Sequence, residues 1–230
     1  MTKQLNTLQN VISSLFLGLV LLMVPAVQKA MADEATPVLN YDIVLGDADA
    51  PVEVIEYAST TCPHCAHFSN EVWPDLEKKY VETGKVRYIF RHFMLNAIDM
   101  DASIISRCAA EKRYYPLLSL IFKKQNSWYQ PKKYRELVDQ YGQETGFKMF
   151  SSQTRDEVIK VARMAGVSQA DADRCLADTA IRDYLINSYK EGIEKYEVNS
   201  TPTFIINGVK HEGGYNFEDF DKAISDALKK

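Results

Sequence analysis

Apolar residues recur at strand spacing and then at helical spacing along the first half of the chain. Two stretches rich in β-branched and aromatic residues come first, then a stretch with helical periodicity, then a third β-rich stretch. They predict two strands, a helix and a further strand at residues 38–45, 52–57, 63–80 and 86–93. Pro74 should kink this helix, because proline lacks a backbone N–H. The order strand, helix, strand predicts a βαβ unit with a right-handed crossover.

The pattern is helical from residue 98 to about residue 196. Thr154 followed by Glu157 has the sequence of a capping box and predicts that a helix begins there. Ser168 with Asp171 is a weaker signal of the same kind. This long stretch therefore predicts a block of several helices.

The last part of the chain returns to strands. An Asn-Gly dipeptide separates short apolar runs at 203–206 and 209–212, which is a strong hairpin signal. Asn216 can then cap a final helix at 217–228. A sheet that resumes after a long helical stretch predicts a helical domain inserted into an α/β fold.

The first 32 residues have the layout of a secretory signal. Lys3 is the only basic residue of the leading region, an apolar stretch covers 11–24, and an A-x-A cleavage sequence ends at Ala32. The apolar stretch is short for a membrane span. An uncleaved N-terminal anchor is the alternative, and a lipoprotein is disfavoured because no cysteine lies near the cleavage point. We therefore expect an exported protein that loses residues 1–32.

The net charge of the chain argues against binding to nucleic acid. The formal net charge is −4, and removing residues 1–32 takes away two lysines and no acids, which leaves −6. A mildly acidic chain of this kind has no basic surface for nucleic acid. The remaining residues suffice for one sizeable core, or for a core with an inserted subdomain.

The strongest chemical signal is the motif Cys62-Pro63-His64-Cys65, which follows a predicted strand and opens the predicted helix. At a helix N-terminus, unpaired backbone N–H groups and the helix dipole favour a thiolate over a thiol. His64 can add a positive charge beside it. Each unit removed from the pKa of Cys62 is worth about 1.4 kcal/mol in favour of the anionic, reduced form. A pair whose reduced form is stabilised is a good oxidant, so the motif predicts redox chemistry.

The alternatives for this cysteine pair are a zinc half-site, a haem attachment site and a structural disulfide. Zinc needs two further ligands, the chain has no second Cys-x-x-Cys, and His64 and His67 are too close for the usual ligand spacing. Haem attachment needs a histidine after the second cysteine, where this chain has Ala66. We therefore predict no metal and no bound cofactor at the motif.

The order of elements and three motifs resemble the DsbA branch of the thioredoxin superfamily. The Pro-His dipeptide between the cysteines is typical of that branch. Glu56, in the strand before the motif, stands where the family has an acid, and Thr201-Pro202 resembles the family's cis-proline turn. The resemblance implies a thioredoxin fold with an inserted all-helical domain. The implied division after the signal is 33–96, 97–196 and 197–230.

Two residues of the motif and one acid receive expected roles. Cys62 should be the exposed nucleophile and Cys65 the buried resolving thiol, since the second sulfur lies a turn deeper in the helix. Glu56 has two interpretations. A strand glutamate is usually exposed, but in a central strand covered on both faces it would be buried with a raised pKa and could exchange protons with Cys65. The resemblance favours the buried acid.

Pro202 is expected to follow a cis peptide bond, on the strength of the resemblance. It would leave the flanking backbone free to pair with an extended substrate beside the sulfur. Thr201 departs from the valine common in the best-known DsbA branch, and threonine is more typical of isomerase relatives. Since this position contacts the active disulfide, the departure bears on redox strength and on substrate preference.

Cys108 and Cys175 both lie in the helical stretch. In an oxidising compartment, two remaining cysteines are expected to bond to each other. Closing that loop would stabilise the fold by roughly 4 kcal/mol in the chain-entropy model. The alternative is two buried free thiols. A second disulfide in the insertion resembles an alphaproteobacterial subset of the family, and we interpret the pair as structural.

The motifs and the resemblance together predict an exported thiol:disulfide oxidoreductase that oxidises dithiols in the periplasm. Its expected partners are reduced, unfolded exported proteins and, for reoxidation, a DsbB-like quinone-linked membrane oxidase. We expect it to act as a monomer. The first alternative is a disulfide isomerase or reductase of the same superfamily. The second is a non-catalytic binding module or chaperone on the same scaffold.

Overall fold

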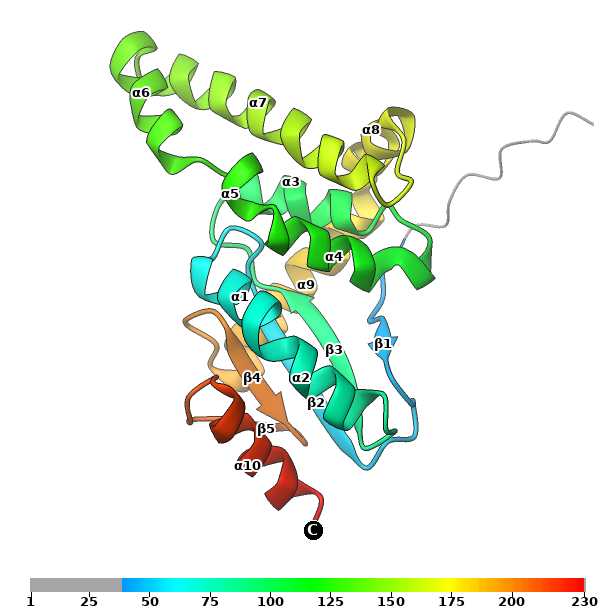
Figure 1. Cartoon of the computed structure of the whole chain (residues 1–230). Helices are drawn as coiled ribbons and strands as arrows, with labels where there is room; N and C mark the ends of the chain where they lie inside the picture. Colours follow the sequence, from blue (N-terminus) through cyan, green and yellow to red (C-terminus); the bar gives the residue numbers. More distant parts are fainter. Residues whose placement is uncertain (1–38, 230) are drawn as a thin grey trace, which may run out of the picture. The chain divides into compact units, whose positions relative to one another are not determined.

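The structure is a computed structural model that describes residues 39–229 (Figure 1). The predicted signal, residues 1–32, lies outside the described residues. A mixed sheet has the strand order β1-β3-β2-β4-β5. Its strands are β1 (Val44–Leu45), β2 (Val52–Ala58), β3 (Val86–His92), β4 (Thr203–Ile206) and β5 (Val209–Lys210). β2 and β3 run parallel and the other neighbouring pairs are antiparallel, so β2 is a central strand.

Helices make up most of the remaining described chain. In order they are α1 (Pro63–His67), the π-helical turn η1 (Phe68–Val72), α2 (Trp73–Leu76), the π-helical turn η2 (Glu77–Val81), α3 (Ala97–Ser106), the 3₁₀ turn η3 (Glu111–Arg113), α4 (Tyr114–Lys123), α5 (Gln125–Trp128), α6 (Pro131–Tyr141), α7 (Gln143–Arg163), α8 (Gln169–Ala177), α9 (Thr179–Tyr196) and α10 (Phe217–Ala227). Helices α3 to α9 all come between β3 and β4, so the sheet is interrupted by a helical insertion, as predicted. No helix within residues 39–229 is long and apolar enough to cross a membrane.

The helix predicted at residues 63–80 forms, with a change of winding at its proline. The chain stays helical through α1, η1, α2 and η2. Pro74 has no N–H to donate to a preceding carbonyl. In the turn before it, the Trp73 N–H donates to the Phe68 carbonyl five residues back, which is the wider π-helical pattern. The proline is thus accommodated inside one continuous helical segment.

Helices lie on both faces of the sheet (Figure 1). Alternate residues of a strand point to opposite faces, so successive side chains of β2 meet different layers. Val54 packs with side chains of η1, η2 and α10, whereas Ile55 packs with tyrosines of α9. The approach of α9 requires Gly192, because a Cβ at that position would lie 2.8 Å from the Tyr57 ring. Glu56 shares the face of Val54. It therefore lies in a central strand with a helical layer over its side chain, which is the condition for a buried acid.

The helical insertion has a core of its own. Isoleucine and leucine side chains from α3, α4 and α9 are fully buried in it. Cys108 and Cys175 belong to the same cluster, and the structure joins them by a disulfide with Cα atoms 6.0 Å apart. Burying each large aliphatic side chain contributes about 1.5–3 kcal/mol, so these helices do not depend on the sheet alone for burial.

The first predicted strand is shorter than expected. Of residues 38–45, only Val44–Leu45 is a strand, and residue 38 lies outside the described residues. The chain before β1 is held by a side chain instead of a neighbouring strand, since the buried Arg107 donates to the Leu39 carbonyl. Apolar, β-rich sequence is therefore not sufficient for a strand when a buried guanidinium provides the backbone partner.

The helix start predicted at Thr154 is wrong. Helix α7 runs unbroken from Gln143 to Arg163, and Thr154 is buried inside it. A capping-box sequence begins a helix only where the preceding chain is not helical, and residues 143–153 already wind as a helix that packs on α6. The starts predicted at Ser168 and Asn216 are confirmed, because each side chain accepts a hydrogen bond from a backbone N–H three residues on.

Candidate active site

Cys62 is the N-cap residue of α1, at the end of the loop that leaves β2. Pro63 stands at the start of the helix, where a missing N–H costs no hydrogen bond. The backbone N–H groups of His64 and Cys65 are hydrogen-bonded to the Cys62 sulfur, and this sulfur lies 3.4 Å from the Thr201 carbonyl oxygen. The structure thus brings the cysteine motif and the proline turn together.

The pKa of Cys62 is lowered from 9.0 to about 5. The hydrogen bond with the Cys65 thiol contributes most, contacts with Thr201 and with backbone N–H groups add to it, and burial opposes it. The expectation that Cys62 is exposed is wrong, since the residue is only 4% exposed. The Thr201 turn lies against the sulfur and covers it. The group is therefore a partly covered thiolate at a helix N-terminus.

Cys65 lies deeper in the helix and is fully buried, as predicted. Burial raises the pKa of its thiol far above the ordinary value, and the hydrogen bond to Cys62 and the charge of Glu56 raise it further. The two sulfurs therefore have opposite preferences, with one stable as a thiolate and the other stable as the thiol that donates to it. Such a separation is typical of a pair with two different chemical roles.

Glu56 is 2% exposed, so the buried interpretation is the one the structure supports. Burial raises its pKa to about 8; a hydrogen bond from Tyr88 opposes the rise and the charge of Cys62 adds to it. The Tyr88 hydroxyl donates to Oε2 of Glu56, while Oε1 has no hydrogen-bond partner among the described residues. A carboxyl with a pKa near neutrality can both give and take a proton. Tyr88 was not singled out in the sequence, because a tyrosine in a strand carries no distinguishing signal.

Polar groups of the insertion hold the loop that leads to Cys62. Asp99, fully buried in α3, accepts hydrogen bonds from the Thr60 N–H at 2.9 Å and from the Thr60 hydroxyl at 2.5 Å. Gln125 of α5 donates to the carbonyls of Thr60 and Cys62 at 2.8 and 3.0 Å. Sequence reasoning missed both residues. Their partners are 39 to 65 residues away in the chain, and no local pattern indicates such a contact.

His64 is exposed, and its Nδ1 lies 2.8 Å from the hydroxyl oxygen of Tyr215 in the loop before α10. Its backbone N–H is among the groups that lower the pKa of Cys62, so its main chain acts on the sulfur. His67 follows on the same helix and is also exposed. Tyr215 was not foreseen, because 151 residues separate it from its partner.

The Thr201–Pro202 peptide bond is cis, as the resemblance implied. Both residues are partly exposed and come just before β4, which pairs with β2. The Thr203 hydroxyl donates to the Ser200 carbonyl at 2.8 Å and closes the turn. Backbone at residues 200–202 therefore lies at the surface beside Cys62.

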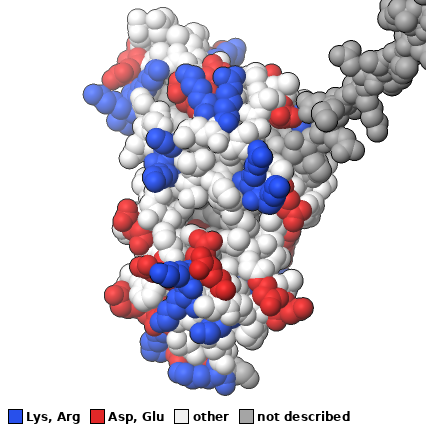
Figure 2. Space-filling model, turned by 45° about the vertical axis from the view of Figure 1, so that its right-hand side comes forward, with Lys and Arg blue, Asp and Glu red and all other residues white. Residues whose placement is uncertain are grey.

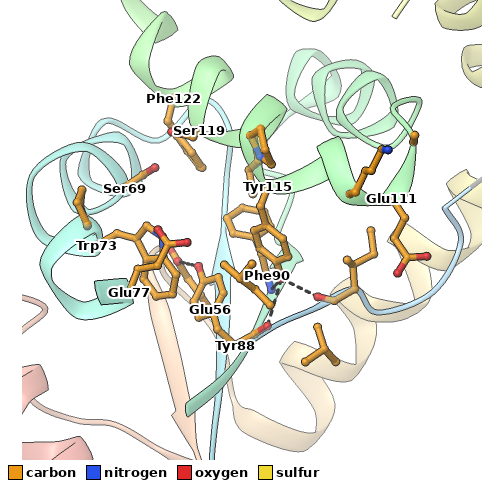
Figure 3. Close-up of a pocket in the computed structure, with 18 residues that line it drawn as sticks. Glu56, Ser69, Trp73, Glu77, Tyr88, Phe90, Glu111, Tyr115, Ser119 and Phe122 are labelled. Atoms are coloured by element: carbon orange, nitrogen blue, oxygen red, sulfur yellow. Dashed lines mark hydrogen bonds between the residues drawn. The ribbon is translucent and has the colours of Figure 1, made fainter. Parts of the chain in front are cut away.

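A cavity of about 840 Å³ adjoins Glu56, and its lining includes no residue of the cysteine motif (Figure 3). On the face shown in Figure 2, basic and acidic side chains are intermixed and a hollow opens near the centre, with acidic side chains at its edge. Within residues 39–229, no three His, Cys, Asp or Glu side chains are grouped so that they could hold a metal ion. Among the described residues, Glu56 thus lies between the Cys62–Cys65 pair, with which it interacts electrostatically, and this cavity, which it lines.

The sequence model of the thioredoxin family matches residues 39–226. The chain therefore belongs to the thioredoxin family, and its helical insertion and cysteine motif are those of the DsbA-like branch.

Among curated proteins, the chain is 33% identical over 189 residues to a Rickettsia bellii protein provisionally named protein-disulfide oxidoreductase. It is 31% identical over 191 residues to a Rickettsia typhi protein with the same kind of name. The matches cover 82% and 83% of this chain and 65% and 63% of those proteins. The chain thus spans somewhat less than two thirds of the length of these relatives.

Two solved structures are similar over most of their length. The crystal structure of a protein-disulfide isomerase from Novosphingobium aromaticivorans has a TM-score of 0.69 and 28% identity, and the match covers 82% of this chain and 98% of that one. The crystal structure of Wolbachia pipientis alpha-DsbA1 has a TM-score of 0.65 and 29% identity, covering 84% and 94%. Both similarities extend across the sheet and the helical insertion.

Proposed function

We propose that the chain is an exported thiol:disulfide oxidoreductase that introduces disulfide bonds into folding proteins by exchange at Cys62 and Cys65. One observation carries the proposal: the pKa of Cys62 is lowered to about 5 beside a buried thiol, Cys65, whose pKa is raised. A thiolate this stable is a stable reduced product and a good leaving group. The oxidised pair would therefore transfer its disulfide readily to a substrate dithiol.

Exchange begins with a disulfide between Cys62 and Cys65. A substrate thiolate attacks the Cys62 sulfur, a substrate–Cys62 disulfide forms, and Cys65 leaves as a thiolate. Because Cys65 is fully buried and its pKa is raised, this thiolate takes up a proton. Glu56 is the proposed donor, since its pKa of about 8 keeps it protonated at neutral pH and, once ionised, it interacts electrostatically with Cys65.

A second substrate thiolate then attacks the substrate sulfur of the mixed disulfide. The substrate leaves oxidised, and Cys62 leaves as a thiolate that the Cys65 thiol and nearby N–H groups stabilise. Two electrons have passed from the two substrate thiols to the cysteine pair. Glu56 regains its proton through the adjoining cavity of about 840 Å³, which is far larger than the roughly 30 Å³ that a water molecule occupies.

The compartment and the partners belong to the same proposal. The signal-like residues 1–32 support export to the periplasm, where reduced, unfolded exported proteins would be the substrates. The partly exposed turn at Thr201 and Pro202 offers backbone to an extended substrate beside Cys62. Reoxidation of the pair is assigned to a DsbB-like quinone-linked membrane oxidase. The protein would act as a monomer, with residues 97–196 as the inserted domain.

A disulfide isomerase or reductase is the second candidate function. The observation in its favour is Thr201, whose carbonyl contacts the Cys62 sulfur at 3.4 Å and whose type is more usual in isomerase relatives. The similar protein from Novosphingobium aromaticivorans is named a protein-disulfide isomerase. Both functions use the same exchange steps, so the redox potential of the pair distinguishes them.

Equilibration of the Cys62–Cys65 pair with glutathione buffers, followed by mass spectrometry, tests the oxidase. We expect a potential of about −120 mV, near the oxidising end of the range for such pairs, together with rapid oxidation of a reduced two-cysteine peptide. A potential near −270 mV, in the range of reductases, would overturn the oxidase and favour the second candidate. Refolding of a scrambled disulfide protein, run alongside, measures isomerase activity directly.

A further inference from the structure

The proposed exchange chemistry uses the cavity beside Glu56 only as a route for protons. The cavity lies between the strands β1 and β3, the helical segment from η1 to η2, and the segment formed by η3 and α4. Its volume of about 840 Å³ is in the range of pockets that bury small organic molecules. Its side chains therefore indicate what kind of molecule it would take.

The walls of the cavity are aromatic. Trp73 and Tyr88 lie with ring centroids 4.0 Å apart, and Tyr88 and Tyr115 with centroids 5.8 Å apart. The rings of Phe90 and Phe122 also face the cavity. Aromatic faces of this kind attract both apolar groups and organic cations.

The charged groups of the lining are mainly acidic. Glu56, Glu77 and Glu111 contribute carboxyl groups, and Lys112 contributes a single ammonium group. Figure 3 shows Glu56 and Glu77 near one end of the cavity, beside Trp73, and Glu111 at the other. Partial burial raises the pKa of Glu77, which is half-buried at the edge of the cavity. Once Glu56 is ionised, the carboxylates of the lining outnumber its one ammonium group, and the cavity then favours a positive ligand.

Glu56 supplies a second, independent indication of a ligand. It is 98% buried, it lines the cavity, and its Oε1 has no hydrogen-bond partner among the described residues. The Tyr88 hydroxyl satisfies only the other oxygen. A buried carboxyl oxygen without a donor is costly, and a molecule in the cavity that brings an N–H group would remove that cost.

We propose that this cavity is a binding site for a small organic cation, an aromatic or alkyl body carrying a protonated primary amine that donates to Oε1 of Glu56. The body lies among Trp73, Tyr88 and Tyr115, and the ammonium group lies at the acidic end. A metal ion does not fit this description, because the described residues have no cluster of three metal-ligating side chains. An anion would meet two carboxyl groups at the same end.

A bound ammonium group would also affect the cysteines, a consequence that rests on the proposed function. It favours the ionised form of Glu56, and the ionised form has no proton to give to Cys65. Binding would therefore slow the first exchange step without touching either sulfur. The cavity would act as an inhibitory site whose lining includes neither the cysteines nor the Thr201–Pro202 turn.

The test compares three probes of equal length by isothermal titration calorimetry on the full chain at pH 8.5. They are 4-phenylbutylamine, 4-phenylbutanol and 4-phenylbutyrate. At this pH the amine, with a pKa near 10.4 for an alkylammonium group, is still protonated, and Glu56, with a pKa of about 8, is mostly ionised. We expect the amine to bind at least about tenfold more tightly than the alcohol, and the carboxylate not to bind detectably.

Two variants locate the contact. Glu56→Gln keeps the size of the side chain and removes its charge, and it should reduce the preference for the amine over the alcohol to less than about twofold. Glu53→Gln is the matched control on the same strand; it pairs with Arg87 at the surface, does not line the cavity, and should leave the preference intact. Ser119→Trp, at an exposed position of the lining, should weaken both probes by filling the opening.

A repeat at pH 6 gives a further readout. Protonation of Glu56 should then remove most of the preference for the amine. Cys62 stays a thiolate at both pH values because its pKa is about 5, and the nearby tyrosines stay neutral because their pKa values are raised. The titratable or charged groups that pack near Glu56 or share its cavity are Cys62, Cys65, Glu77, Tyr88, Glu111, Lys112, Tyr114 and Tyr115.

Equal binding of the amine and the alcohol, or an unchanged preference in Glu56→Gln, overturns the proposal. So does unchanged binding in Ser119→Trp, since the probe would then lie elsewhere; this exposed variant keeps the test decisive if Glu56→Gln does not fold. Cys62→Ser separates the two proposals. It should abolish exchange and keep the preference for the amine, so loss of exchange activity says nothing against the binding site.

Discussion

The two cysteine pairs of this chain have nearly the same burial and opposite surroundings. Cys62 and Cys65 are 4% and 0% exposed, and Cys108 and Cys175 are both 1% exposed, so burial does not distinguish them. Cys62 has backbone N–H groups, a carbonyl and a second thiol within hydrogen-bonding reach, with a titrating carboxyl nearby. The other pair lies in the apolar cluster of the insertion, where the Cys108 sulfur meets one helix carbonyl, that of Ile104, at 3.4 Å.

Local electrostatics, rather than access, therefore distinguishes the pair proposed to react from the pair proposed to be structural. A sulfur at a helix N-terminus is stable as an anion, whereas a sulfur in an apolar cluster is stable only as a thiol or in a disulfide. The four predictions below test this contrast, beginning with the largest expected effect.

Replacing the sulfur at the helix N-terminus should abolish exchange altogether. Cys62→Ser removes the atom that a substrate thiolate attacks, and serine forms no disulfide. Oxidation of a reduced two-cysteine peptide, followed by thiol titration, should fall to the rate in buffer. Cys108→Ala combined with Cys175→Ala is the matched control and should keep full activity. Residual activity in Cys62→Ser would contradict the assignment of the motif.

Removing the carboxyl beside the pair should stabilise the protein at high pH. The pKa of Glu56 is about 8 when folded against an ordinary 4.5, so the folded state holds a proton that the unfolded chain loses between these values. The free energy of unfolding therefore falls as the pH rises from about 4.5 to about 8. Glutamine does not titrate, so the free energy of unfolding of Glu56→Gln should not fall in this way. Between pH 4 and pH 9 its stability relative to the parent should therefore rise by roughly 3–5 kcal/mol.

Urea unfolding of both proteins across this pH range measures the difference directly. Glu53→Gln on the same strand is the control, and losing its surface ion pair with Arg87 should change stability by less than about 1 kcal/mol. A difference between Glu56→Gln and the parent that stays constant with pH would mean that the buried carboxyl is ionised throughout.

Removing the disulfide between Cys108 and Cys175 should lower stability without changing the exchange chemistry at Cys62. Cys108→Ala with Cys175→Ala releases a loop spanning 67 residues and should lower the free energy of unfolding by about 2–4 kcal/mol. The pKa of Cys62, measured from thiolate absorbance at 240 nm, should remain near 5. A shift of this pKa by more than one unit would show that the two pairs are not independent.

Loosening the loop that presents the nucleophile should have the smallest effect. Gln125→Ala removes two hydrogen bonds, to the carbonyls of Thr60 and Cys62, and should cost about 1–2 kcal/mol. Gln130→Ala, which removes a single hydrogen bond at the surface, is the control. Hydrogen exchange of the backbone N–H groups at residues 60–62 should accelerate only in Gln125→Ala. Equal protection in both variants would exclude Gln125 as a residue that positions this loop.

The sequence predicts those parts of the site that are close together in the chain. The cysteine motif, its helix and the preceding strand are contiguous. The same β-rich run holds Glu53 as well as Glu56, and only the family resemblance favoured Glu56 as the buried acid. Tyr88, Asp99, Gln125 and Tyr215 carry no such signal, since each reaches the site from a distant element. The wrong prediction at Thr154 has a related cause: a capping-box sequence starts a helix only where the residues before it are not already helical. Site residues that are close together in the chain are thus predictable, whereas residues that contact the site from distant elements are not.

Asp99 and Gln125 belong to α3 and α5, yet their partners are in the loop after β2. The insertion therefore cannot be treated as a removable module. A shortened chain that joined β3 directly to β4 would retain every residue of the motif and would leave the polar backbone at Thr60 and Cys62 to be satisfied by water. Exposed positions of these helices could be substituted freely. The two buried side chains, in contrast, hold the loop after β2 by hydrogen bonds, so the insertion and the sheet depend on each other structurally.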